Sequence, residues 1–502
     1  MSMVNLKSEH IPVIVGVGEI TNRPRDLAQG LEPAALMVES LRRAQQDAGA
    51  DLIRSLDSLD VINSFSWPYR DLPGTLCEML GMTPARVVYR PVGGETPTLS
   101  LHQAAQRIAL GQSTVAAVCG GEAERTVQWA RREKFSLPWS APDPNWTREF
   151  ARDFMHAEMV KHDLLRPLDI YPLYENAIQH LWGQTPAEGN AESAALWAEY
   201  AAVAATNPYA WLPRAATAEE IATASAANRP IAWPYLKTMM AQPGVNQGAA
   251  VIVTSLAHAE KCGIGRHKLI HLWGGAHANE PRDVLSRAQL QSSPAMEEVL
   301  ARAVQVAGDG EFDLLELYSC FPCVPKMARR AIPSLRAPAP TVAGGLTFFG
   351  APVNNYMTHA VAAMVRALRA GGSKGLLYGQ GGHVTKHHAL VLAREASPHA
   401  MARENFSVQA AADARRAAPP PVLADYRGSC VVESHTVLYT RDGAPQHGSV
   451  IGRAPGGERL IARVPAADQE AIAFLTDPAR SPIGAVGVVK PGRGELLEWS
   501  LS

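Results

Sequence analysis

Long apolar runs, an excess of charge of one sign and cysteine are all scarce in this chain of 502 residues. No apolar run approaches the ~20 residues that a membrane-spanning helix needs, and the first residues lack the order of a signal peptide. The formal net charge of −1 gives no general attraction to nucleic acid or to anionic membranes. We therefore expect a cytoplasmic protein with no membrane span and no nucleic-acid partner.

Six cysteines in so long a chain do not make a disulfide framework, and most should be small buried side chains. Cys320 and Cys323 form a CxxC pair, which is weak evidence for zinc or thiol redox chemistry when no second pair accompanies it. Packing is the favoured interpretation. The spacing of His383, His387 and His388 suggests a metal site, but the last two should point to opposite sides of a strand. We expect no metal site.

What the chain does contain is 47% hydrophobic residues and only 19% charged residues, which is typical of a globular protein with a large core. Apolar runs alternate with helical patterns up to residue 124, which predicts a mostly parallel sheet covered on both sides. Gly16 and Gly18 follow the first run, but the spacing of a dinucleotide-binding fingerprint is absent. A tight turn fits these glycines better. The expected strands are 11–15, 59–63, 87–89 and 115–119, and the expected helices are 33–48, 71–80 and 97–110.

The stretch from Pro91 to Glu124 predicts a helix that is buried on nearly every face. Its apolar positions recur at helical spacing with small residues between them, and Thr96 is suited to cap the helix. Groups at its start, Gly94 and Glu95, would face unpaired N–H groups and the positive end of the helix dipole. Such a position is suited to catalysis. Glu95 is either a carboxylate stabilised by the dipole or a base.

The pattern recurs in the second half of the chain. A glycine-rich approach, 344–356, leads into a helix at 356–370 and a strand ending in glycine, as in the first half. Between the two halves, 125–245 breaks the pattern, carries seven of the ten tryptophans and predicts an insertion without repeated strands, packed as a roof over the core. The second half should contain strands 268–273, 313–318, 375–378 and 388–393, and helices 294–307 and 324–331.

After a linker rich in alanine and proline, the chain changes class. Short strand patterns with turn signals from Ser429 to Leu501, and one helix near 467–474, predict a small barrel of the oligonucleotide/oligosaccharide-binding (OB) type. No clear basic and aromatic stripe accompanies it, so an interaction module is favoured. The predicted domains are 1–255 (with the insertion at about 125–245), 256–400, a linker at 401–425 and the barrel at 426–502.

These motifs resemble the thiolase superfamily, especially the noncanonical bacterial thiolase-like proteins with an extra C-terminal domain. The resemblance implies an α/β fold, the duplicated five-layer αβαβα thiolase fold, with the site between the halves. Counting back from Gly111 places the family's nucleophilic cysteine at Gly94, or at Glu95 with a slip of one residue. Its Gly-His-Pro turn matches Gly350-Ala351-Pro352, its Cys-x-Gly turn matches Gly379-Gln380-Gly381, and its fourth motif, His-Asp-Cys-Phe in sterol-carrier-protein thiolases, matches Tyr318 to Phe321. All four chemical groups differ here.

The resemblance implies a coenzyme A thioester as ligand and no required cofactor. Classical thiolase activity should be absent because no thiolate is available. Three functions stay open: an atypical acyltransferase (acetyl-CoA acetyltransferase-like) of lipid metabolism, a retro-aldol lyase on a β-hydroxyacyl-CoA, and a non-catalytic acyl-CoA-binding or scaffold protein. For the lyase, Tyr318, Tyr356 and His383 could act with the amides of Gly94 and Gly379.

The expected cleft brings together Gly94, Glu95, Tyr318, Ala351, Asn354, Asn355, Gly379 and Gln380. For Tyr318, a buried tyrosine with a satisfied hydroxyl is the alternative, and for Asn354 and Asn355 it is turn formation. Thiolases are usually dimers, but the additional tail could cover that surface, so monomer and homodimer both stay open. The C-terminal domain is the expected contact for a protein partner.

Overall fold

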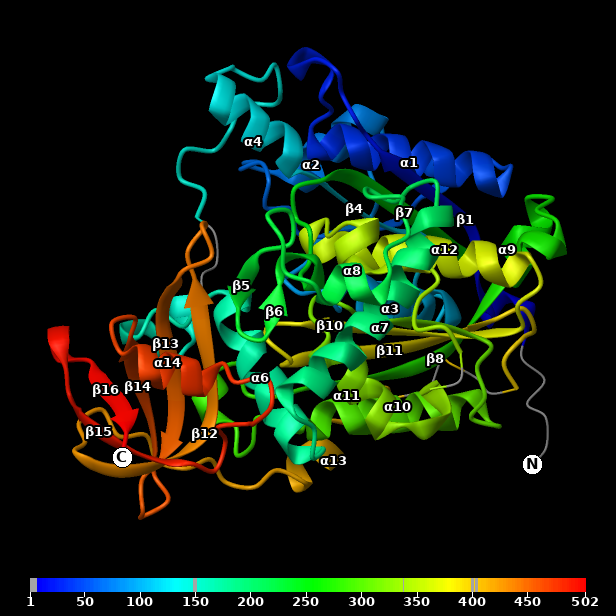
Figure 1. Cartoon of the computed structure of the whole chain (residues 1–502). Coiled ribbons are helices and arrows are strands. Elements are labelled where there is room, and N and C mark those ends of the chain that lie inside the picture. Colours follow the sequence, from blue (N-terminus) through cyan, green and yellow to red (C-terminus); the bar gives the residue numbers. More distant parts are fainter. Residues whose placement is uncertain (1–6, 148–150, 337, 399–400, 402–404) are drawn as a thin grey trace.

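The computed structural model describes residues 7–147, 151–336, 338–398, 401 and 405–502. Its main body has five layers (Figure 1): two outer helical layers, two layers of strands and a central pair of helices, α3 and α12. The five-layer fold class predicted from the sequence is thereby confirmed. The helices are α1 (Pro33–Ala48), α2 (Leu72–Leu80), α3 (Thr96–Ala109), α9 (Leu256–Lys261), α10 (Pro294–Ala307), α11 (Cys323–Ala331) and α12 (Tyr356–Arg369).

The strands of both halves join into one sheet of order β3-β2-β4-β7-β1-β8-β11-β10-β9. The halves meet where β1 and β8 pair at only two positions, Val13 with His271 and Ile14 with Ile270. The strands are β1 (Pro12–Thr21), β2 (Ser58–Val61), β3 (Arg86–Tyr89), β4 (Val115–Ala123), β7 (Asn246–Ser255), β8 (Ile270–Asn279), β9 (Leu314–Leu317), β10 (Lys374–Gly381) and β11 (Lys386–Ala393).

The expectation of a mostly parallel sheet is wrong. Only β2 with β3, β2 with β4, and β9 with β10 run parallel, whereas β7 runs antiparallel to both β1 and β4. A strand buried on both faces is apolar throughout whichever way it runs. The hydrophobic pattern therefore does not indicate strand direction. The insertion before β7 is long enough for this strand to run either parallel or antiparallel to its neighbours.

Helix α3 is enclosed as predicted, because strands of both layers and α12 pack around its small and branched apolar residues. Leu101, Ala104, Ala105 and Ile108 are all at most 1% exposed. The cap differs from the expectation. Thr96 is the first helical residue and its hydroxyl donates to the Pro91 carbonyl at 3.2 Å, while Glu95 occupies the N-cap position without a side-chain capping bond.

The insertion consists of helices and one short hairpin. Its elements are α4 (Glu124–Glu133), α5 (Ala157–Lys161), α6 (Pro167–Leu181), α7 (Pro186–Thr206), α8 (Ala218–Ala222), β5 (Pro230–Ala232) and β6 (Tyr235–Leu236). The sequence did not predict that this hairpin joins the sheet of the C-terminal domain, where β5 pairs with β12 through Ala232 and Leu438. Strands this short, flanked by Pro230 and Pro234, are set by tertiary contacts and leave little pattern.

The C-terminal β-barrel is confirmed. Its elements are β12 (Gly428–Tyr439), β13 (Pro445–Arg453), β14 (Arg459–Pro465), α14 (Gln469–Leu475), β15 (Val486–Pro491) and β16 (Leu497–Leu501). The ring closes because β12 pairs with both β13 and β15, β13 with β14, and β16 with both β14 and β15. A separate core that includes Val450, Leu460 and Trp499 fills it.

Polar contacts fix this barrel to the main body. Arg459 is fully buried and donates to the carbonyls of Leu285 and Arg287 at 2.9 and 2.7 Å, as well as to Glu433 of its own domain. From α6, Asn176 donates to the His435 carbonyl at 2.8 Å. The barrel is therefore held by its neighbours as well as by its own core.

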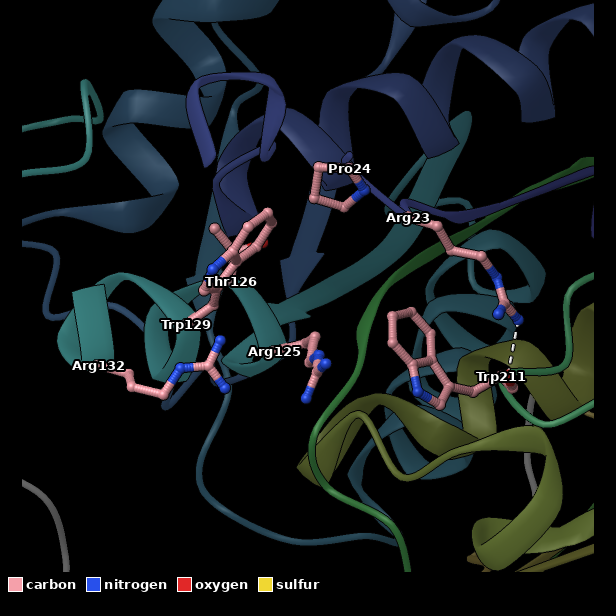
Figure 2. Close-up of a pocket in the computed structure, with 7 residues that line it drawn as sticks. All are labelled: Arg23, Pro24, Arg125, Thr126, Trp129, Arg132 and Trp211. Carbon is pink, nitrogen blue, oxygen red and sulfur yellow. Dashed lines mark hydrogen bonds between the residues drawn. The ribbon is translucent and has the colours of Figure 1, made fainter. Parts of the chain in front are cut away.

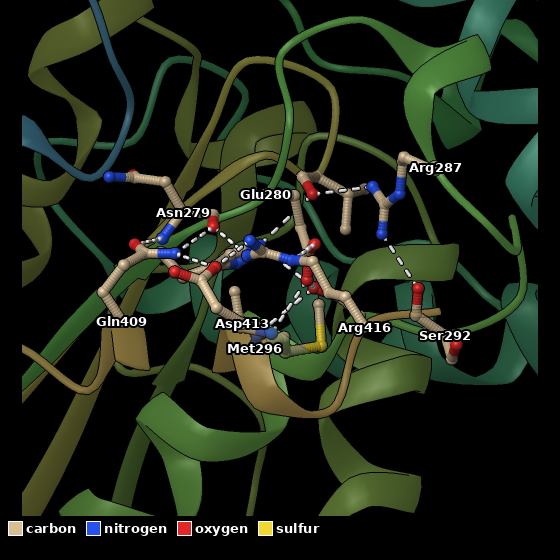
Figure 3. A network of polar contacts seen from close by, with 12 residues as sticks. Asn279, Glu280, Arg287, Ser292, Met296, Gln409, Asp413 and Arg416 are labelled. Carbon is tan, nitrogen blue, oxygen red and sulfur yellow. Dashed lines mark hydrogen bonds and ion pairs between the residues drawn. The ribbon is translucent and has the colours of Figure 1, made fainter. Parts of the chain in front are cut away.

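The segment expected as a linker is also anchored (Figure 3). It contains α13 (Gln409–Ala414), whose Gln409 exchanges hydrogen bonds of 2.8 and 2.9 Å with the backbone of Asn279 at the end of β8. Arg416 donates to Glu280 at 2.8 Å.

Within the described residues, no helix combines the length and apolar character that crossing a bilayer demands.

Candidate functional site

The start of α3 meets the end of β9 and the end of β10 at one point between the halves. A Cβ atom on Gly94 would lie 2.6 Å from Tyr318 Cζ, and closer still to the Tyr318 hydroxyl and the Gln380 carbonyl oxygen. Gly94, Tyr318 and Gln380 are therefore in direct contact. The tyrosine hydroxyl occupies the space that a side chain at position 94 would need.

Gly379 lies on the other side of the helix start. A Cβ atom there would be 3.0 Å from both Glu95 Cα and Thr98 Oγ1, which is tighter than nearly all real Cβ contacts. Glycine at this position lets β10 approach the first turn of α3. The predicted meeting of Gly94, Glu95, Tyr318, Gly379 and Gln380 is thus present in the structure.

The Glu95 side chain fills the space beside the neighbouring glycines. A Cβ on Gly93 would be 2.7 Å from Glu95 Cδ, and Gly381 is equally close to the carboxylate. Burial raises the pKa of Glu95, and Lys386 opposes this rise by favouring the charged form. Among the described residues, Glu95 Oε2 is a buried atom with no hydrogen-bond partner. A carboxyl group in this state holds its proton more tightly than an exposed one.

Tyr318 is 7% exposed, and burial raises the pKa of its hydroxyl well above the ordinary value, with Cys320 and Glu95 adding to the rise. No partner for this hydroxyl is found in the part of the chain that the structure describes. The Tyr318 ring packs edge-on against Tyr356 with centroids 6.0 Å apart. Tyr318 is therefore a neutral hydrogen-bond donor, which suits binding of a carbonyl oxygen better than abstraction of a proton.

Tyr356 does not share this role. Its hydroxyl donates to Glu316 at 2.7 Å and accepts from the Gly345 amide at 3.0 Å, and the side chain has no exposed surface. Burial raises the pKa of Glu316 to about 7. Both functions of the Tyr356 hydroxyl are occupied, so Tyr356 supports the Tyr318 ring and the glycine-rich approach to α12.

Asn354 and Asn355 form the wall of the site. Asn354 accepts from the Gly93 amide at 3.0 Å and donates to the Asn63 carbonyl at 3.0 Å. Asn355 donates to the Gly120 carbonyl at 2.7 Å and accepts from Thr358 at 2.6 Å. These bonds tie the turn before α12 to the first half, which matches the turn-forming alternative. Ala351 is buried behind them, with its amide bonded to the Gln242 carbonyl at 2.9 Å.

His383 follows β10 in the left-handed region, with φ of 62°. Burial lowers its pKa to about 4, with Arg282 adding to the effect, so the ring is neutral at pH 7. Its Nδ1 atom is buried and has no partner among the described residues. Backbone strain of this kind persists only where the surroundings enforce it. His383 is therefore held in place with an unused ring nitrogen.

Tyr171 of α6 belongs to the same region and was missed by sequence reasoning. Its hydroxyl donates to Gln380 Oε1 at 3.0 Å, its ring stacks on Phe321 with centroids 4.4 Å apart, and it lies 5.9 Å from the His383 ring. The expected roof is thus supplied by α6. The signal in the sequence was weak, because α6 carries just two tyrosines, Tyr171 and Tyr174.

The cysteines beside this site are unsuited to nucleophilic attack. Burial raises the pKa of the Cys320 thiol to about 12 and that of Cys323 well above its usual range. Both thiols are therefore protonated at neutral pH. Cys320 contacts Gln380 Oε1 at 3.6 Å, and Cys323 contacts the Tyr171 carbonyl at 4.0 Å. Packing explains both residues.

His387 and His388 point to opposite sides of β11. His387 Nδ1 forms a hydrogen bond of 2.8 Å with the Tyr378 hydroxyl, whereas His388 Nε2 lies 3.1 Å from Nδ1 of His102 on α3. Among the described residues, no three or more His, Cys, Asp or Glu side chains are arranged to hold a metal ion.

Comparisons with known proteins agree with this fold. Residues 408–493 match the family model "Thiolase-like protein type 1 additional C-terminal domain". A monomeric SCP2-thiolase like protein type 1 from Mycobacterium smegmatis is 29% identical with a TM-score of 0.82, covering 98% of this chain and 99% of that one. No curated protein matches the sequence.

More distant structures share the fold alone. The Ltp2-ChsH2(DUF35) aldolase is 18% identical with a TM-score of 0.58, covering 77% of this chain and 98% of that one. Human mitochondrial 3-ketoacyl-CoA thiolase is 14% identical with a TM-score of 0.55, covering 77% of this chain and 100% of that one. The chain therefore has the fold of these thiolase-like proteins, and its residues 408–493 match the type 1 additional C-terminal domain.

Proposed function

We propose that this protein binds an acyl-CoA, or a similar pantetheine thioester, between its halves and does not carry out cysteine-dependent acyl transfer. The observation that carries the proposal is a pair of buried polar atoms without partners among the described residues, Glu95 Oε2 and His383 Nδ1, together with the Tyr318 hydroxyl, for which no hydrogen bond is found in the same part of the chain. Buried polar groups are rarely left unpaired, and a ligand is one explanation for such a set. A thioester carbonyl would satisfy the Tyr318 hydroxyl.

The absence of a thiol supports the second half of the proposal. Acyl transfer of the thiolase type needs a thiolate and a base that makes it. Position 94 has no side chain, Ala351 stands in the matched histidine turn, and the nearby Cys320 thiol has a pKa of about 12. An atypical acyltransferase would therefore need a nucleophile that this site does not offer.

The binding test is a calorimetric titration of the purified protein with acyl-CoAs of different chain length. We expect saturable binding, and Tyr318→Phe should weaken it about three- to tenfold because one hydrogen bond to the thioester is lost. Tyr426→Phe on the barrel is the matched control and should bind like the wild type. Absence of saturable binding to every acyl-CoA, or equal affinity of the Tyr318→Phe protein, would contradict the proposal.

A retro-aldol lyase is the second candidate, and the state of Glu95 favours it. Cleavage of a β-hydroxyacyl-CoA needs a base for the β-hydroxyl and donors for the enolate of the thioester. The Glu95 carboxyl, whose pKa is raised by burial, and the neutral His383 are suited to the proton transfer, and Tyr318 to the donor role. The assay is release of an aldehyde or ketone from β-hydroxyacyl-CoAs. Turnover that survives Glu95→Gln would exclude Glu95 as the base, and absence of turnover with every substrate that binds would leave the non-catalytic function.

A further inference from the structure

A hollow lies away from the site between the halves (Figure 2). It has a volume of about 410 Å³ and is lined by Arg23, Pro24, Arg125, Thr126, Trp129, Arg132 and Trp211. None of these residues is among the candidate site residues. Arg125, Trp129 and Arg132 stand at i, i+4 and i+7 of α4 and so share one face of the helix. Arg23, after β1, and Trp211 of the insertion form the opposite wall.

The charge of this hollow is of one sign. Three of its lining side chains are guanidinium groups and none is acidic. Arg132 pairs with Glu133 at 3.0 Å, but both side chains are more than half exposed, so that pair is weak. Within the described residues, Arg23 and Arg125 have no carboxylate partner. Three such groups around one space favour a ligand that carries negative charge.

Two of the lining residues, Arg23 and Trp211, are held in place by hydrogen bonds to backbone carbonyls. Arg23 donates to the carbonyls of Ala210 and Trp211, both at 2.7 Å, and its guanidinium lies 4.8 Å from the centroid of the Trp211 ring. The Trp211 amide donates to the Phe349 carbonyl at 2.6 Å, and its Cβ packs on Gly350. The wall formed by Arg23 and Trp211 is therefore fixed to the turn that carries Ala351.

The two tryptophans narrow the chemistry of the ligand. An aliphatic acid would use the arginines and leave the indoles, whereas a neutral aromatic ring would use the indoles and leave the arginines. Guanidinium groups recognise phosphate oxygens in a planar, bidentate manner, and indole faces stack on planar bases. The volume lies within the ordinary range for small-molecule sites. We propose that this hollow binds a nucleotide, either a free one or the nucleotide end of coenzyme A.

Calorimetry with ADP, adenosine, pyrophosphate and coenzyme A tests this site. ADP should bind saturably, and adenosine and pyrophosphate should each bind at least about tenfold more weakly, because each engages only half of the lining. The double change Arg125→Ala and Arg132→Ala should weaken ADP binding by at least about tenfold. Trp129→Ala should weaken ADP binding and leave pyrophosphate binding unchanged.

Arg131→Ala is the matched control, because Arg131 is on the same helix but lines a different hollow with Lys134 and Phe135. It should bind ADP like the wild type. If coenzyme A binding falls with ADP binding in the double variant, the ligand is the nucleotide end of coenzyme A; if only ADP binding falls, it is a free nucleotide. Absence of saturable ADP binding, full affinity of the double variant, or an equal loss in Arg131→Ala would overturn the proposal.

Discussion

Replacing Gly94 by alanine tests whether Tyr318 fills the site. The added Cβ would lie 2.6 Å from Tyr318 Cζ, whereas ordinary contact begins at 3.4 Å, and the Gln380 carbonyl oxygen on its other side belongs to the backbone of β10. Neither neighbour is the far end of a flexible chain. We expect Gly94→Ala to destabilise the protein by about 1–3 kcal/mol, the usual cost of overpacking a core.

A double-mutant cycle isolates the contact with the tyrosine. Tyr318→Ala alone should cost about 3–5 kcal/mol because it opens a cavity, and the added methyl group at position 94 should recover part of that loss. The double variant should therefore be about 1–2 kcal/mol more stable than the sum of the single effects predicts. The measurement is native-state hydrogen exchange of the α3 amides, since a chain with several cores need not unfold in one step.

The control is Gly244→Ala, where the nearest atom to an added Cβ is the tip of the Gln242 side chain at 3.4 Å. It should change stability by at most about 0.5 kcal/mol. If Gly94→Ala is as mild as this control, or if the two changes at 94 and 318 simply add, Tyr318 does not occupy the space beside Gly94 and the assignment of the site is wrong.

Three further predictions concern buried charges. Burial raises the pKa of Glu95, so the folded state binds the proton more tightly than the unfolded state, and this carboxyl lowers stability as pH rises above 4.5. In urea titrations, the stability of Glu95→Gln relative to the wild type should therefore increase with pH. The control Glu219→Gln, which changes an exposed carboxyl, should show no such increase. Lys326→Met should cost about 3–5 kcal/mol because it leaves the buried charge of Glu175 without its cation, and adding Glu175→Gln should restore part of this loss in the same titrations. Arg459→Ala should loosen the barrel, seen as faster proteolytic cleavage after α13, because its buried bonds to the main body are lost.

Much of the fold was predictable because its elements carry local signals. The buried helix at 96–109 has small residues on nearly every face, and the strands of the barrel are separated by turn residues, so both were found with nearly the observed bounds. Strand direction and the β5–β12 pairing were not, since they depend on contacts between distant segments. The strands of the two halves pair at only two positions, Val13 with His271 and Ile14 with Ile270, a feature that no local pattern encodes.

The site was predictable in position more than in role. The turns around Gly94 and Gly379 could be placed because glycine and its apolar neighbours remain recognisable when the reacting side chains differ. The orientation of Tyr356 could not be predicted, because its hydroxyl is taken by Glu316, a residue on the neighbouring strand β9. Tyr171 was missed for a similar reason: it reaches Gln380 from an insertion whose docking the sequence does not specify.

The glycines of this site therefore have a different use from the one that the resemblance implies. In an open site, glycine at 94 and 379 would let the backbone approach a thioester. Here Gly93, Gly94 and Gly381 also make room for two side chains of the protein itself, since Glu95 and Tyr318 lie where their Cβ atoms would be. A thiol introduced at position 94 would meet the Tyr318 ring and would find no imidazole at Ala351 to deprotonate it. One substitution cannot recreate thiolase chemistry in this scaffold, because the space for the nucleophile and the base that activates it are missing together.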